Sequence, residues 1–153
     1  MIAVIAILLM VAADQLVKYW AVTVLQAVPG GTIPLIQNVF HLTYVENRGA
    51  AFSILQNKIW LFVLITVVIL GAMVYVLRRG LLHTALGRWA VYVIAGGAVG
   101  NLLDRIFRHY VVDLFDFRLI HFPVFNVADI CVCVGGVLFA YYFLFQHDKA
   151  VKE

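Results

Sequence analysis

The chain has 153 residues, of which 65% are hydrophobic and only 12% are charged. Soluble domains of this size bury about two-thirds of their surface and carry about a quarter charged residues, so the composition excludes a soluble fold and places the apolar excess against lipid. The net charge of +3 is small and scattered, which argues against a surface that binds nucleic acid.

Four apolar segments are long enough to cross a bilayer. The first covers residues 2–28 and ends at Pro29. It has no basic start and stays apolar beyond Lys18, so we expect a retained helix and not a cleaved signal peptide. The other predicted helices cover residues 59–77, 86–107 and 126–145. Their short connections favour an all-α membrane protein with a single domain (1–153), an antiparallel four-helix bundle with both termini on one side.

The connection after the first helix is long and includes a predicted strand at residues 39–45. Phe40, Leu42 and Tyr44 alternate there with more polar neighbours, the period-2 pattern of a ribbon with one apolar face. Backbone outside a helix cannot lie against lipid in the hydrocarbon region, so we expect this connection at the membrane interface, with residues 50–55 dipping inward.

The distribution of basic residues in the loops predicts the orientation. Five lie on the side of the two termini and four on the other. They are Arg78, Arg79, Arg88, Lys149 and Lys152 against Arg48, Lys58, Arg108 and Arg118. This bias favours both termini in the cytoplasm and the 29–58 connection outside.

Cys131 and Cys133 are the only cysteines. On a helix they point about 200° apart, because each residue turns by about 100°, so a disulfide between them is geometrically poor. No Cys/His spacing resembles a zinc site. We therefore expect two small apolar helix residues, no metal and no cofactor.

Acidic residues in or near membrane spans are costly and need a reason. Of the eight in the chain, six map to one membrane face when the spans alternate: Asp14, Glu46, Asp104, Asp113, Asp116 and Asp129. Asp14 and Lys18 are four residues apart and share a helix face. They predict either an ion pair that neutralises two costly charges or a direct part in binding substrate.

The third predicted helix carries a polar stripe at spacings of three and four. Its members are Gly97, Asn101, Asp104, Arg105 and Arg108. Gly96 and Gly100 form a GxxxG pattern, which permits close approach of a neighbouring helix. The alternative to a functional stripe is an interfacial ion pair between Asp104 and Arg105, with the glycines serving only packing.

Asn126 and Asp129 at the start of the fourth helix have the spacing of a capping box, and an acid there also meets the positive end of the helix dipole. A cap does not explain Asp113 in the preceding loop. Two aspartates brought close together cannot both ionise easily, so one activates water while the other keeps a proton and polarises a carbonyl. The combination indicates amide hydrolysis without a metal.

Five segments occur in the order seen in one known family: DQLVK (14–18), NRGAAFS (47–53), GGAVGNLLDR (96–105), VVD (111–113) and FNVAD (125–129). The chain resembles lipoprotein signal peptidase, the signal peptidase II family of bacterial aspartyl proteases. The resemblance extends from Asp14 to about Gly136. Two departures, Leu114 and Ile130 next to the matched aspartates, concern only local packing.

The resemblance implies a four-transmembrane-helix bundle with a small extracytoplasmic β-rich cradle in the bacterial cell membrane. It implies cleavage of diacylglyceryl-modified prolipoproteins just before the lipobox cysteine by a catalytic pair, Asp113 and Asp129. Substrate-binding or site-supporting positions fall on Asn47, Asn101, Arg105, Asn126, Asp14, Lys18, Gly100 and Asp104. Expected partners are this substrate and membrane lipids, with no nucleic acid and a monomeric enzyme.

Two other classes of function fit parts of the pattern. A small proton- or ion-coupled transporter also places acids in membrane helices, but typically near the midplane and in repeated halves. A non-catalytic scaffold subunit gives no reason for six acids on one face. Asp116 is a nearby acid that the residues alone do not separate from Asp113.

Overall fold

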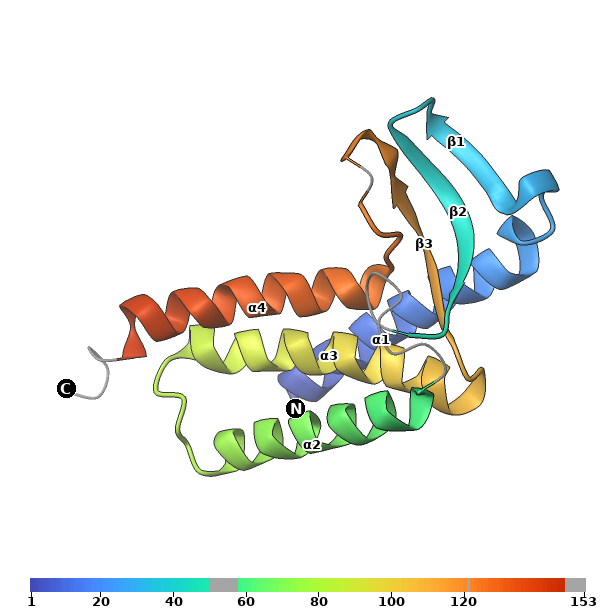
Figure 1. Cartoon of the computed structure of the whole chain (residues 1–153). Coiled ribbons are helices and arrows are strands. Elements are labelled where there is room, and N and C mark those ends of the chain that lie inside the picture. Colours follow the sequence, from blue (N-terminus) through green and yellow to red (C-terminus); the bar gives the residue numbers. More distant parts are fainter. Residues whose placement is uncertain (50–57, 121, 148–153) are drawn as a thin grey trace.

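The computed structural model describes residues 1–49, 58–120 and 122–147, and its frame is four long helices (Figure 1). They are α1 (Ile2–Trp20), α2 (Ile59–Arg78), α3 (Ala85–Phe107) and α4 (Val127–Phe145). All four are long and apolar enough to cross a membrane. The four predicted helices are confirmed. The predicted inward dip at 50–55 lies outside the described residues, as do Lys149 and Lys152 of the charge count.

Local signals set several of the helix boundaries. The Thr84 side chain accepts a hydrogen bond from the Gly87 N–H (3.2 Å) and caps the start of α3. Beyond the end of α2, Gly80 has φ +66°, a left-handed conformation that glycine adopts without steric cost. Short polar and glycine-containing segments therefore stop each span close to where the apolar pattern ends.

The first helix continues beyond Trp20 as a π-helical turn, η1 (Ala21–Leu25). It does not reach residue 28 as an unbroken helix: a short 3₁₀ turn, η2 (Pro29–Gly31), redirects the chain into the first strand. Gly30 and Gly31 have φ of 75° and 60°, conformations that favour glycine. The predicted end of this segment was therefore about three residues too late.

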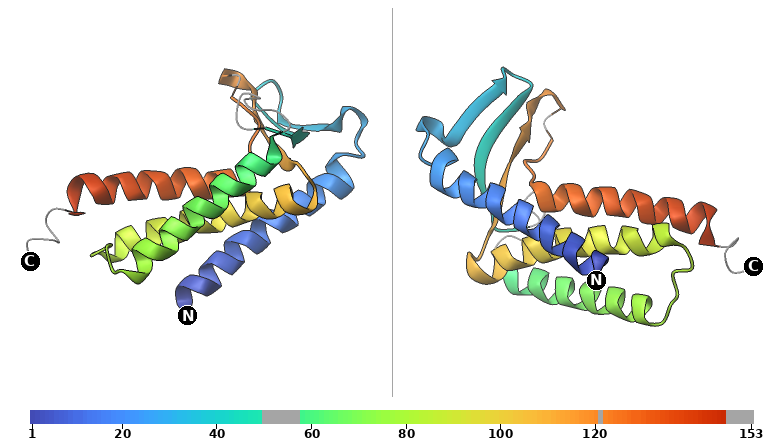
Figure 2. Two further views of the ribbon diagram at one scale, coloured as in Figure 1. Left: turned by 60° about the horizontal axis from the view of Figure 1, so that its bottom comes forward. Right: turned by 180° about the vertical axis from the view of Figure 1, so that it is seen from behind.

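Helix α3 lies between the other three helices and packs against each of them (Figures 1 and 2). A Cβ added at Gly96 would lie 2.8 Å from Met10 Cε of α1, and one added at Gly97 would collide with the Ala128 carbonyl of α4. The predicted close approach at the glycines is confirmed. Helix α2 has no buried residue, which fits a span that exposes apolar side chains to lipid on most of its surface.

Three antiparallel strands form a sheet in the order β1-β2-β3 at one end of the bundle (Figure 2). They are β1 (Thr32–Ile36), β2 (Phe40–Asn47) and β3 (Val111–Phe117). The predicted strand is confirmed as β2 and is two residues longer at its end. Pro34 is tolerated in β1 because that strand is an edge of the sheet.

The sheet rests on the extension of α1. Ala21 and Leu25 of η1 are fully buried against Val112 and Leu114 of β3. Leu42 packs against the same cluster, so the apolar face predicted for β2 meets this core. The C-terminal extension of α1 therefore supports the sheet and positions β3 next to the C-terminal end of α3 and the N-terminal end of α4.

A second contact joins β3 directly to the start of α4. The backbone of Phe115 donates to Phe125 O at 2.8 Å and accepts from Phe125 N at 3.1 Å. The two rings also pack together, with centroids 5.5 Å apart. These contacts bring Asp113, two residues before Phe115, to the level of Asn126, one residue after Phe125.

Candidate active site

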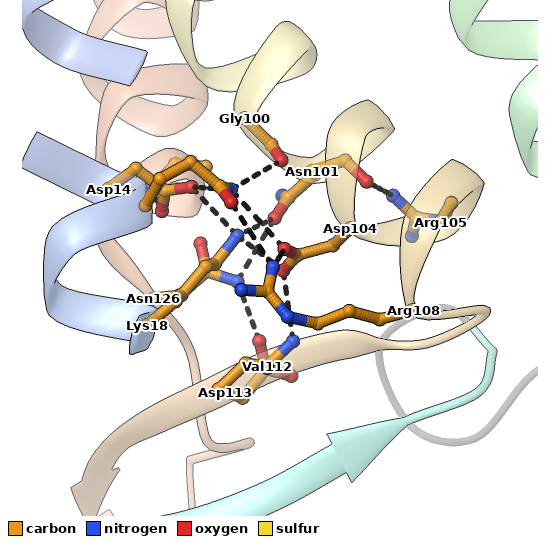
Figure 3. A network of polar contacts seen from close by, with 12 residues as sticks. Asp14, Lys18, Gly100, Asn101, Asp104, Arg105, Arg108, Val112, Asp113 and Asn126 are labelled. Atoms are coloured by element: carbon orange, nitrogen blue, oxygen red, sulfur yellow. Dashed lines mark hydrogen bonds and ion pairs between the residues drawn. The ribbon is translucent and has the colours of Figure 1, made fainter. Parts of the chain in front are cut away.

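Asp113 and Asp129 come from different elements, β3 and α4, and both bond to Asn126 (Figure 3 shows Asp113 and Asn126). Asn126 Nδ2 donates to Asp113 Oδ1 at 2.6 Å. Its backbone N–H donates to Asp129 Oδ2 at 3.2 Å, and its Oδ1 accepts from the Asp129 N–H at 2.9 Å. The predicted capping box is therefore confirmed. The cap residue also holds the second aspartate, so capping and site support are not alternatives here.

Two further asparagines complete the coordination of the carboxylates. Asn101 of α3 donates from Nδ2 to Asp129 Oδ1 at 2.8 Å. Asn47 donates from Nδ2 to Asp113 Oδ2 at 2.9 Å. Asn47 lies two residues beyond Val45, the β2 partner of Asp113, a diagonal pair that lies on one face of the sheet and within reach.

Each asparagine amide has its orientation dictated by a third group. Asn101 Oδ1 accepts from the Lys18 ammonium at 2.8 Å, and an ammonium can only donate. Asn47 Oδ1 accepts from the Gly49 N–H at 3.0 Å, and Asn126 Oδ1 accepts from a backbone N–H as described. The NH₂ groups must therefore all face the two aspartates, which orients both carboxylates.

The two aspartates have unequal surroundings. Asp113 is buried, with 2% of its surface exposed, whereas Asp129 is partly exposed at the N-terminal end of α4. Burial is the largest cause that raises the pKa of Asp113, from 3.8 to about 7, and the negative charge of Asp129 adds to it. Hydrogen bonds from Asn47 and Asn126 and the charge of Lys18 oppose this rise in pKa. A substantial fraction of Asp113 is therefore protonated near neutral pH.

A network of buried charges lies beside the pair, between α1 and α3 (Figure 3). Lys18 Nζ lies 2.9 Å from Asp14 Oδ2 and 2.9 Å from Asp104 Oδ2, and all three side chains are at most 1% exposed. With Asn101, these acceptors use the three ammonium hydrogens. The predicted Asp14–Lys18 ion pair is present, and Asp104 is a second partner.

Asp104 does not pair with Arg105, contrary to the alternative considered from the sequence. Its ion pairs are with Lys18 and with Arg108, which follows four residues later. Successive helix residues turn by about 100°, so Arg108 shares the face of Asp104 and Arg105 does not. Arg105 donates to the Asn101 carbonyl at 3.3 Å, and its guanidinium lies 5.1 Å from the centre of the Phe62 ring of α2.

Gln15 is part of the network but was absent from the predicted site. Its Nε2 lies 3.2 Å from Asp104 Oδ1 and 3.2 Å from the Gly100 carbonyl. Its Oε1 accepts from Arg108 at 3.1 Å. The sequence signal that could have indicated Gln15 is its polarity inside an apolar span, directly after Asp14.

Gly100 allows Asp14 to reach this position. A Cβ at residue 100 would lie 2.6 Å from Asp14 Oδ2, closer than real Cβ contacts. The stripe on α3 therefore divides by function: its glycines admit neighbouring helices, while Asn101 and Asp104 reach into the polar network.

The remaining acids of the sheet bond elsewhere. Asp116 Oδ2 accepts from Arg118 Nε and from Thr43 Oγ1, both at 2.7 Å. Glu46 pairs with Arg48 at 2.9 Å on the surface. Among the described residues, Asp113 is the sheet aspartate that bonds to Asn126, so geometry distinguishes it from Asp116.

No group of three or more His, Cys, Asp or Glu side chains within residues 1–49, 58–120 and 122–147 could hold a metal ion. Cys131 and Cys133 are both free. The described site offers two carboxylates held by asparagine amides, of which Asp113 is buried and Asp129 is partly exposed.

The family model and the relatives that match this chain are described as signal peptidases. Residues 6–145 match the family model described as signal peptidase (SPase) II. A lipoprotein signal peptidase of Clostridioides difficile (strain 630) is 45% identical over 150 residues, covering 98% of this chain and 99% of the relative. One from Brevibacillus brevis is 46% identical over 136 residues, covering 88% of this chain and 89% of the relative.

Solved structures of bacterial membrane enzymes are also similar. One, determined in meso at 2.3 Å resolution, has a TM-score of 0.84 and 29% identity, covering 99% of this chain and 91% of its own. Another, at 1.9 Å resolution, has a TM-score of 0.83 and 30% identity, covering 94% and 93%.

Proposed function

Because the chain belongs to the signal peptidase II family, membrane aspartyl proteases that process prolipoproteins, we propose that Asp113 and Asp129 are its catalytic pair. The observation that carries this proposal is the shared residue Asn126, which donates to both carboxylates, from its side-chain amide to Asp113 and from its backbone N–H to Asp129. The transporter alternative is not supported, since the family and the relatives are peptidases.

The unequal solvent exposure of the two aspartates supports a division of their roles. Asp129 is the more exposed of the two and lies at the N-terminal end of α4, so water reaches it more readily. It is the base that takes a proton from the attacking water. Asp113 is buried and its pKa is raised to about 7, so its protonated form is available near neutral pH to give a proton to the carbonyl oxygen as the hydroxide attacks.

The second half of the reaction reverses these proton positions. The tetrahedral intermediate collapses as its C–N bond breaks, and the leaving nitrogen takes the proton that Asp129 received. Asp113 recovers its proton from the intermediate's hydroxyl as the new carboxyl group forms. The products are a signal peptide with a free carboxylate and a lipoprotein with a free α-amino group, and the pair returns to its starting state.

The supporting residues keep this geometry without reacting. Asn47, Asn101 and Asn126 donate to the carboxylates and leave part of each oxygen free for water and substrate. Arg105 lies at the edge of the site, bonded to the Asn101 carbonyl. We assign to it a role in holding the substrate backbone.

The preferred substrate is a prolipoprotein whose lipobox cysteine carries diacylglycerol, cut just before that cysteine. Support comes from the combination of lipid-facing helices with carboxylates at one end of the bundle. Large apolar side chains are exposed along the spans, Leu8, Trp60, Val68 and Phe143 among them. They provide a surface for membrane lipids, the acyl chains and the signal helix. The proposed enzyme is a monomer, because one copy of the chain brings together both aspartates and the three asparagines that donate to them.

The direct test uses the purified protein and a diacylglyceryl-modified precursor peptide. Asp113→Asn and Asp129→Asn are expected to abolish cleavage, a loss of at least about 1,000-fold if each carboxylate is essential. Asp116→Asn is the matched control, since this neighbouring acid bonds away from the pair, and it is expected to cleave normally. Substantial turnover by a folded Asp113→Asn or Asp129→Asn protein would refute the pair.

The proposed orientation places both termini in the cytoplasm and the active site at the extracytoplasmic face. The test introduces single cysteines at Lys58 and Arg79, at opposite ends of α2, in a chain with Cys131 and Cys133 replaced by serine. A membrane-impermeant thiol reagent should label intact cells at position 58 and not at 79. The reverse pattern would overturn the orientation and leave the catalytic pair untouched.

A further inference from the structure

Three buried charged residues have no part in the proton transfers described above. Asp14, Lys18 and Asp104 are at most 1% exposed, and no bond joins them to Asp113 or Asp129 among the described residues. Burying three charges is expensive even when they are paired. Their placement therefore needs a reason beyond neutralising one another.

The Asp14 and Asp104 carboxylates each also accept a backbone hydrogen bond from another element. Asp14 Oδ1 accepts from the Ala128 N–H at 2.9 Å. Asp104 Oδ2 accepts from the Val112 N–H at 3.1 Å (Figure 3). Ala128 immediately precedes Asp129, and Val112 immediately precedes Asp113.

Both N–H groups lie in places where secondary structure leaves backbone donors available. Ala128 is in the first turn of α4, where backbone N–H groups lack helical acceptors, and the Asn126 cap serves the next residue. Val112 lies on β3, an outer strand of the three-stranded sheet. The two side chains thus complete the hydrogen bonding of the backbone on which the catalytic residues stand.

One ammonium group joins the two contacts. Lys18 Nζ lies 2.9 Å from an oxygen of each carboxylate and donates to Asn101 Oδ1 at 2.8 Å. The position of α1 relative to α3 therefore determines where Ala128 and Val112 are held. The same ammonium orients the Asn101 amide toward Asp129.

We propose that Asp14, Lys18 and Asp104 form a clamp that holds the backbone before each catalytic aspartate and so sets the separation of the two carboxylates. The proposal rests on the catalytic pair proposed above and assigns these three side chains as positioning residues. They act on the rate of the chemical step and not on substrate binding. Displacing a reacting group by about 1 Å can cost about 100-fold in rate.

The test compares two substitutions at each acid. Asp14→Asn and Asp104→Asn keep an oxygen that accepts the backbone N–H, whereas Asp14→Leu and Asp104→Leu keep approximate size without an acceptor. The clamp predicts that kcat on a diacylglyceryl-modified precursor peptide falls about 100-fold in the leucine variants and no more than about 10-fold in the asparagine variants. KM is expected to stay within about twofold throughout.

A stability control separates positioning from a merely structural role. Tyr142 is buried at the opposite end of the bundle, and Tyr142→Leu is expected to lower the melting temperature without changing any contact of the clamp. It is expected to keep a normal kcat at temperatures where it is folded. Equal kcat in the asparagine and leucine variants, or kcat losses that follow the melting temperature as in Tyr142→Leu, would overturn the clamp.

Two further sets of variants are measured in the same assay. If the leucine variants do not fold, Asp14→Ala and Asp104→Ala replace them, with the same expected difference in kcat from the asparagine variants and the same unchanged KM. Asp113→Asn is measured alongside. Its full activity would refute the catalytic pair, whereas an inactive Asp113→Asn with no difference between asparagine and non-acceptor variants would refute only the clamp.

Discussion

Ion pairs occur in two regions of this molecule, and the same residue types do different work in each. Between α1 and α3, Lys18 bridges Asp14 and Asp104 in a network that is at most 1% exposed. On the sheet, Glu46 pairs with Arg48 and Asp116 with Arg118, and the arginines are 56% and 41% exposed. The distances are similar, from 2.7 to 2.9 Å.

The two regions differ in burial and not in distance, so burial determines how much an ion pair contributes to stability. An exposed pair gains little over separate hydrated ions. A buried pair has lost its water, so each member depends on the others and the removal of one is costly. The buried network can therefore hold other groups in place, and the exposed pairs cannot.

Removing the shared cation is expected to have the largest effect. Lys18→Met leaves Asp14 and Asp104 buried with one fewer positive charge, and we expect a loss of about 3–5 kcal/mol in stability. Thermal unfolding in detergent micelles measures it. A melting temperature equal to that of the parent would contradict the larger contribution of the buried network to stability.

The pH dependence of stability tests the region where the network meets the sheet. The pKa of Asp113 rises from 3.8 to about 7 on folding, so between these values the folded state binds more protons than the unfolded state. Stability then falls as pH rises through this window, by about 1.4 kcal/mol for each pH unit. As pH rises from about 4.5 to about 7.5, the melting temperature of the parent should fall relative to that of Asp113→Asn. A constant difference would contradict the raised pKa.

Two glycine substitutions test whether close helix packing maintains the buried region. In Gly97→Ala the new Cβ collides with the Ala128 carbonyl and lies 2.9 Å from Val132 Cγ2, which should cost about 1–3 kcal/mol and lower activity. Gly136→Ala is the matched control on α4, because its Cβ meets nothing within 4 Å. Melting temperature and turnover check both, and equal behaviour would contradict the packing.

The smallest effect is expected on the sheet surface. Glu46→Gln breaks the ion pair with Arg48, which is exposed, so the change in stability should be below about 1 kcal/mol. The same unfolding assay measures it, and about 0.5 M salt should remove most of the difference. A loss as large as that of Lys18→Met would contradict the comparison.

The fold was largely predictable because its signals are local. Long apolar runs indicated four spans, and the spacing of Asn126 and Asp129 indicated the cap that the structure contains. Asp14 and Lys18, four residues apart, indicated an ion pair that is present. Of the strands, only β2 showed a clear alternation. Strand β1 is interrupted by Pro34, and β3 is a short apolar run whose pattern does not distinguish a strand from a loop.

The site was predictable in its residue types but not in its connections. The resemblance assigned Asp113 and Asp129, and these roles remain a proposal. The choice of Arg108 over Arg105 as the partner of Asp104 follows from helical spacing within α3, which the sequence prediction did not apply. The contacts that Gln15 of α1 makes with Asp104 and Arg108 of α3 required the helices to be placed.

By itself the sequence determined that this protein is a membrane bundle with six of its eight acids toward one end, because hydrophobic length and helical periodicity act over a few neighbouring residues. Only the tertiary structure decided that Asp14 reaches the backbone 114 residues away at Ala128, and that one lysine joins both carboxylates. Such contacts depend on how closely α1, α3 and α4 approach one another. That approach is set by glycines and side chains packing in three dimensions, which no local pattern records.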